Sequence, residues 1–114
     1  MTKLLAAHPD VTAVVCNGDM VAIGASVAVT KLGLTPGVDI SIVGFDDIQD
    51  AAIAMPPLTT MAVSPYDLGR KLARVAIARI REPSMPVATT LVPAQRIVRR
   101  TTGVPVELRE PLAG

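Results

Sequence analysis

The chain has 114 residues, of which 50% are hydrophobic and 18% charged, and its net charge is +1. This composition fits one small globular domain rather than a disordered chain, and it shows no concentrated basic surface of the kind that binds nucleic acid. No apolar stretch is long enough to cross a bilayer, so no membrane partner is expected. The lone cysteine, Cys16, cannot form an internal disulfide, which favours a reducing cytoplasm.

The first half of the chain has the pattern of a strand–helix–strand unit. A short helix ending near residue 7 precedes an apolar strand at residues 11–16, which reads as a buried parallel strand. Residues 20–32 form a helix that is apolar nearly all round, Gly33 ends it, and residues 39–45 form the second strand. A helix of this kind needs cover on more than one side, so we expect it to pack on the sheet and on a second helix or chain.

Shorter elements follow the second strand. Asp47 is interpreted as the cap of a short helix at residues 48–54. Residues 58–63 predict a third strand, and their polar character indicates a position nearer the edge of the sheet.

The clearest helix start in the chain is Ser64-Pro65-Tyr66-Asp67. Serine caps the helix, proline occupies its first position and Asp67 completes a capping box, so a helix is predicted up to about Arg81. Two short strands are expected at residues 89–92 and 95–99. Residues 104–114, with two prolines and no periodicity, are expected to form a flexible tail.

Acidic residues stand at the carboxyl ends of both apolar strands, Asp19 after the first and Asp46 at the end of the second. Ligands of open α/β sheets bind at these strand ends. Asp19 has two open interpretations, a helix N-cap and a ligand contact, and Asn17 beside it either adds an amide or only makes the turn. Carboxylates at such an edge accept hydrogen bonds, which suits neutral polyols and exocyclic amines.

Motifs for catalysis and cofactor binding are missing from the sequence. There is no phosphate-binding glycine loop, and one histidine with one cysteine cannot make a zinc quartet. A Cys16–His8 nucleophile pair is disfavoured because Cys16 lies inside an apolar strand. The sequence therefore predicts no catalytic residue, no metal and no cofactor, and a protein that is not an enzyme.

Several segments together resemble the carboxyl-terminal part of the effector-sensing domain of lactose/galactose-type (LacI/GalR) transcriptional repressors. The match runs from about residue 3 to residue 103. The matching segments include Val14–Ala25, Leu68-Gly69 and Arg96–Gly103, and the two that are highly specific together are Val43-Gly44-Phe45-Asp46-Asp47 and Pro56-Pro57-Leu58-Thr59-Thr60.

The resemblance implies a periplasmic-binding-protein-like (type I) α/β fold, in which two lobes close on a small effector, usually a sugar or a nucleobase. Residues 1–103 are expected to be a truncated parallel-sheet lobe of this domain, with about 48–63 belonging to the first lobe. Full family members also carry a helix-turn-helix, which this sequence lacks, so DNA binding would require that missing part.

The resemblance also implies roles for individual residues. Asp19 is expected to be the main effector contact, with Asn17, Phe45 and Asp46 as secondary contacts. The helix at residues 20–32 is expected to form the interface of a homodimer.

Two alternatives stay open at the level of sequence. One is a sugar-binding protein of a transport system, which shares the fold. The other is a small α/β hydrolase with Asp19 or Asp46 as its nucleophile, although no cationic partner for either carboxylate is evident.

Overall fold

The computed structural model describes residues 1–105, so the part of the expected flexible tail at 106–114 lies outside the described residues. The chain divides into two compact units. Of the described residues, the first unit holds 1–62 and 96–105, and the second holds 63–95.

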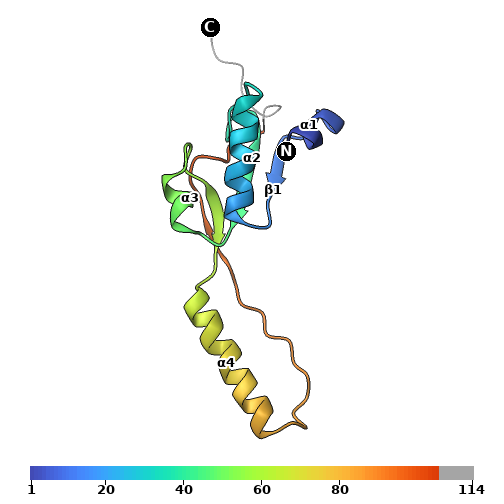
Figure 1. The fold of residues 1–114 in the computed structure, drawn as a ribbon, viewed down its shortest axis with the longest axis vertical. Coiled ribbons are helices and arrows are strands. Elements are labelled where there is room, and N and C mark those ends of the chain that lie inside the picture. The colour runs from blue at the N-terminus through green and yellow to red at the C-terminus, as the bar shows by residue number, and fades with distance from the viewer. Residues whose placement is uncertain (106–114) are drawn as a thin grey trace. The chain divides into compact units, whose positions relative to one another are not determined.

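The first unit, which contains the labelled elements α1, β1, α2 and α3 in Figure 1, is built on a sheet. The strand order of this sheet is β1-β2-β3-β4. These strands are β1 (Ala13–Val15), β2 (Ser41–Phe45), β3 (Thr59–Ala62) and β4 (Gln95–Ile97), which contains the point of return from the second unit. β1 pairs with β2 and β2 pairs with β3, both in parallel. The prediction of an α/β fold with a parallel sheet is confirmed.

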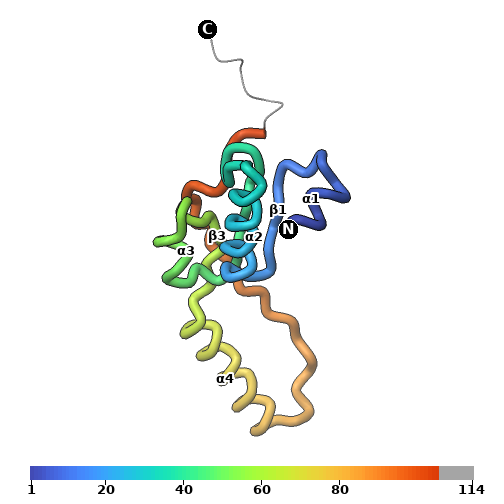
Figure 2. The backbone as a smooth tube through the Cα atoms, turned by 45° about the horizontal axis from the view of Figure 1, so that its top comes forward, coloured from blue at the N-terminus to red at the C-terminus, as the bar shows by residue number. Residues whose placement is uncertain are grey.

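The described part of this unit has three helices, α1 (Thr2–Ala7), α2 (Asp19–Lys31) and α3 (Gln49–Ile53). α2 packs on β2, and Figure 2 shows it between α3 and β1. It ends as predicted, with Gly33 at a φ of 78° and a backbone hydrogen bond of 3.2 Å from Leu34 N to Val29 O. The buried apolar core consists of Cys16, Ala22, Ala25, Val29, Ile40, Ile42, Ala51 and Leu58.

The outer strands are not the ones that the sequence indicated. β3 lies between β2 and β4, and its threonines Thr59 and Thr60 are buried because they bond to neighbouring segments. β1 is an outer strand, and its Val15 is 80% exposed rather than buried. Residues 89–92 form no strand. Polarity alone predicted an edge position wrongly because it cannot distinguish a solvated threonine from a paired one.

Residues 48–62 also differ from expectation, because they pack inside the first unit. Ala51 of α3 and Leu58 are fully buried in the same core as Ile42, and β3 pairs with β2. The segment that forms a unit of its own is 63–95. The expected assignment of about 48–63 to another lobe is therefore replaced by a boundary at residues 62 and 63.

The second unit consists of α4 (Pro65–Arg81) and the segment that follows it. The predicted cap is confirmed, since the Ser64 Oγ accepts a hydrogen bond of 3.2 Å from Asp67 N. Arg79 donates from its guanidinium to the carbonyl oxygens of Met85 and Pro86, which fastens the following loop to the helix. No residue of α4 is buried, so its apolar side is uncovered within the described chain. Among residues 1–105, no helix has the length and hydropathy needed to span a membrane.

Candidate functional site

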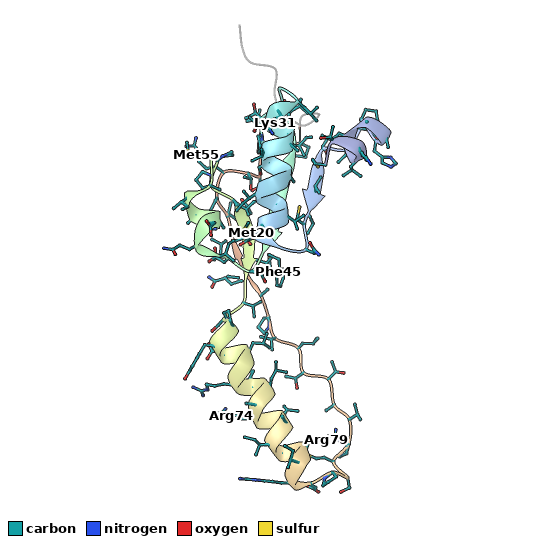
Figure 3. All side chains as sticks on the ribbon, in the orientation of Figure 1. Met20, Lys31, Phe45, Met55, Arg74 and Arg79 are labelled. Carbon is teal, nitrogen blue, oxygen red and sulfur yellow. The ribbon has the colours of Figure 1, made fainter. Side chains whose placement is uncertain are left out.

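The carboxyl ends of β1 and β2 form one rim of the sheet. Val15 pairs in register with Val43, so Asn17 and Phe45, two residues further along, come to the same edge. Both are exposed, and Figure 3 shows Phe45 at the same end of the unit as Met20 and opposite to Lys31. Asp46 joins them, because its Oδ2 lies 3.7 Å from the place where a Cβ on Gly18 would stand.

Asp19 lies beneath this rim rather than on it. The residue is 1% exposed, and both of its carboxylate oxygens have partners. Oδ1 accepts a hydrogen bond of 2.5 Å from Thr60 Oγ1, and Oδ2 accepts one of 2.9 Å from Ile48 N. The predicted N-cap role is wrong, since the cap position belongs to Gly18 and no side-chain cap bond is made. Asp19 instead joins the start of α2 to β3 and to the entrance of α3.

Gly44 explains how a carboxylate fits at this place. A Cβ at Gly44 would overlap Asp19 Oδ1 and would fall 2.9 Å from the Leu58 side chain. Only a residue without a side chain leaves room on β2 for the Asp19 carboxylate. The Val-Gly-Phe-Asp-Asp segment therefore combines a structural glycine with the acidic rim.

Asp46 is the acid that faces outward. It is exposed, and its carboxylate makes no hydrogen bond or ion pair within residues 1–105. Its backbone is nevertheless fixed, because Asp46 N donates a hydrogen bond of 2.9 Å to Met61 O of β3. A free carboxylate on a fixed backbone is suited to accept hydrogen bonds from a ligand's hydroxyl or amino groups.

Asp47 has a different role from the predicted one. It does not cap α3, whose cap position is held by Ile48 without a side-chain bond. Its Oδ1 forms an ion pair of 2.7 Å with Arg99 Nη2.

A threonine network joins β2 and β3 to the segment that follows β4. Thr101 Oγ1 donates to Ile42 O at 2.6 Å and accepts from Thr59 N at 2.9 Å. Thr59 Oγ1 accepts from Arg99 N at 2.9 Å and lies 3.0 Å from Thr102 Oγ1. Sequence reasoning missed Arg99, Thr60 and Thr101 as site-supporting residues. Their only signal was their place in the segments that carry the family resemblance.

The thiol of Cys16 is not part of a reactive site. The side chain is buried, and this burial raises the pKa of the Cys16 thiol above its ordinary value, so the neutral form dominates near pH 7. Within residues 1–105, no three histidine, cysteine or acidic side chains are grouped so that they could hold a metal ion.

Comparison with known proteins identifies the fold family. Residues 1–102 match the periplasmic binding protein-like domain. The chain belongs to this family. Its relatives include the HTH-type transcriptional repressor PurR of Pasteurella multocida strain Pm70, 36% identical over 101 residues that cover 89% of this chain and 30% of that protein. CytR of Escherichia coli strain K12, also an HTH-type transcriptional repressor, is 32% identical over 102 residues, 90% of this chain and 30% of CytR.

Solved structures of regulators have the same fold. A complex of the transcriptional regulator CelR with cellobiose matches with a TM-score of 0.76 and 30% identity, over 88% of this chain and 31% of CelR. The lac repressor dimer bound to operator and the anti-inducer ONPF matches with a TM-score of 0.73 and 31% identity, over 90% and 36%. A LacI-family regulator of Enterococcus faecium with bound ribose matches with a TM-score of 0.71 and 27% identity, over 90% and 38%.

These matches confirm the resemblance to the effector-sensing region of LacI-type repressors. The chain spans about 30% of the length of the curated relatives it matches. Both curated relatives named above are HTH-type transcriptional repressors.

Proposed function

We propose that this chain is the carboxyl-terminal part of the effector-sensing domain of a cytoplasmic LacI-type repressor. In this proposal the rim formed by Asn17, Phe45 and Asp46 contacts a small polyhydroxylated effector, a carbohydrate. Support comes from the exposed, unpaired carboxylate of Asp46 at the strand ends, and from regulators of the same fold whose structures hold cellobiose or ribose.

In this proposal Asp46, rather than Asp19, is the main effector contact. Asp19 is buried and bonded to Thr60 and Ile48, so breaking those bonds would cost more than a new bond to a sugar returns. Asp46 loses no bond of its own when a ligand arrives. Phe45 is exposed beside it and offers an apolar ring face against which a sugar can lie.

The signalling mechanism follows from the division into two units. The chain leaves the first unit at residues 62 and 63 and returns at residues 95 and 96. We assign residues 63–95 to the other lobe of the domain, so that both connections act as crossings. An effector bound at the rim would favour one closure angle of the lobes, and this population shift would change the geometry of a DNA-binding dimer.

Replacement of Asp46 by asparagine is expected to weaken sugar binding about tenfold, because one charged acceptor of the sugar's hydroxyl groups is lost. The measurement is an amide NMR titration of the 114-residue chain with D-ribose and, separately, with cellobiose. Binding should shift the amide signals of Asn17, Gly18 and Asp46. Asp50→Asn is the matched control, since Asp50 is also exposed but lies on α3.

Unchanged affinity in Asp46→Asn, or an equal loss in Asp50→Asn, would remove Asp46 from the site. Sugar-induced shifts confined to other parts of the chain would overturn the proposed location.

The homodimer interface is proposed on the outer side of α2. Met20 and Val27 stand there 68% and 50% exposed, on the side opposite the buried residues Ala22 and Val29. A dimer is known for the lac repressor structure cited above. Apolar side chains gathered on one helix side favour burial against a second copy.

A charge at Val27 is expected to disrupt this association. Val27→Glu should shift the chain from dimer to monomer in sedimentation velocity measurements, because a carboxylate would have to be desolvated in the interface. Val87→Glu is the matched control, since Val87 is 91% exposed and lies outside every helix and strand. A dimer that persists in Val27→Glu, or one lost equally in Val87→Glu, contradicts the proposed interface.

A further inference from the structure

The turn after β2 is backbone-strained at two consecutive residues. Asp46 has a φ of 109° and Asp47 a φ of 54°, and neither is a glycine. Conformations of this kind are unfavourable for residues with a side chain and persist only where surrounding contacts impose them. The contacts that impose this one therefore decide where the Asp46 carboxylate points.

Three contacts from different segments hold the turn. Asp46 N donates to Met61 O of β3 at 2.9 Å, and Ile48 N donates to Asp19 Oδ2 of α2 at 2.9 Å. The third is the ion pair of 2.7 Å between Asp47 Oδ1 and Arg99 Nη2. Within residues 1–105, this last contact is the only one of the three that acts on a side chain of Asp46 or Asp47.

Arg99 is fixed in place independently of Asp47. Its Nη1 donates to Leu58 O at 2.9 Å, and its backbone N donates to Thr59 Oγ1 at 2.9 Å. The side chains of Arg99 and Asp47 are 19% and 28% exposed, so water screens their attraction only in part. Leu58 and Thr59 therefore hold Arg99 in place independently of its ion pair with the Asp47 carboxylate.

We propose that Asp47 and Arg99 are positioning residues that hold the turn at positive φ and thereby present the Asp46 carboxylate at the rim. The proposal rests on the function proposed above only in taking Asp46 as the effector contact. Without the ion pair, Asp46 and Asp47 relax toward negative φ, and the Asp46 carboxylate leaves the rim beside Gly18.

The contacts of this turn also lie close in sequence to the two connections between the units. Met61 is the last residue but one before the chain leaves the first unit, and Arg99 follows shortly after the chain returns at Arg96. The turn that carries Asp46 is therefore bonded to the segment that precedes the first connection and to the segment that follows the second.

NMR measurements on the 114-residue chain test this proposal without any sugar. The one-bond Cα–Hα couplings of Asp46 and Asp47 report the sign of φ, and hydrogen exchange of the Asp46 amide reports its bond to Met61. Arg99→Met should abolish the positive-φ signature and speed exchange of the Asp46 amide about tenfold, the effect of losing one charged hydrogen bond. Arg99→Lys, which keeps the charge, should restore the signature in part.

Arg100→Met is the matched control, since Arg100 is the exposed neighbour and its side chain makes no hydrogen bond or ion pair within residues 1–105. It should leave both readouts unchanged. Arg99→Gln serves as a second variant if Arg99→Met does not fold, because glutamine keeps a donor for Leu58 O but removes the charge. Positive φ retained in every folded variant without the arginine charge would overturn the proposal, as would an equal loss in Arg100→Met. A failure of sugar binding leaves these readouts unaffected.

Discussion

An Asp19→Ala variant of the 114-residue chain is expected to lose about 3 kcal/mol of unfolding free energy, because a buried carboxylate that accepts two hydrogen bonds disappears. The loss leaves Ile48 N and Thr60 Oγ1 without their acceptor, and Thr60 is fully buried. Urea denaturation followed by circular dichroism measures the change. Thr60→Val removes only one of the two bonds and should cost less than Asp19→Ala.

Asp50→Ala is the control for Asp19→Ala, since it removes an exposed carboxylate from the first turn of a neighbouring helix. It should change stability by less than about 0.5 kcal/mol. If Asp19→Ala proves equally harmless, the internal bonds of Asp19 carry no stability, and the residue becomes available again as an effector contact.

The local elements of this fold were predictable because each has a local cause. Ser64, Pro65 and Asp67 mark the start of α4, and the predicted cap bond to Ser64 is present. Gly33 ends α2 because the chain there needs a positive φ. The parallel pairing of β1 and β2 followed from a helix placed between two apolar strands.

The site was only partly predictable because its bonds join distant parts of the sequence. Asp19 and Thr60 are 41 residues apart, and Asp47 and Arg99 are 52 apart. A carboxylate at a helix start satisfies the pattern of a cap whether it bonds its own helix or another strand. The sequence therefore predicted that acidic residues lie at these strand ends, but it did not indicate that Asp19 is buried and Asp46 is exposed.

The wrong prediction that the polar third strand lies near the sheet edge has the same cause, because its partners are distant in the sequence. Thr59 and Thr60 read as solvated residues, yet the Thr101, Arg99 and Asp19 bonds satisfy them in the interior. A buried threonine with a partner costs little, because its hydroxyl exchanges water for a protein atom. The pattern of residues 58–63 therefore cannot indicate that these threonines are paired in the interior.

A Gly44→Ala variant is expected to lose about 3 kcal/mol of unfolding free energy, since one methyl group must enter occupied space. Its Cβ would overlap Asp19 Oδ1 and press on the Leu58 side chain. Gly24→Ala is the control with the opposite sign. A Cβ at Gly24 meets nothing within 4 Å, so alanine in the middle of α2 should stabilise the chain by about 0.5–1 kcal/mol.

A double variant of Asp19→Ala and Gly44→Ala distinguishes an overlap with the Asp19 carboxylate from a general loss of packing. Once Asp19→Ala has removed the carboxylate, the methyl group of Gly44→Ala has room, so the second substitution should cost less than about 1 kcal/mol in the double variant. Denaturation of the two single variants and the double variant gives the interaction energy directly. Additive losses would mean that Gly44 is needed for a reason other than the Asp19 carboxylate. A double variant that loses about 2 kcal/mol less than the sum of the two single variants would show that Gly44 is needed on β2 because the buried acid lies against it.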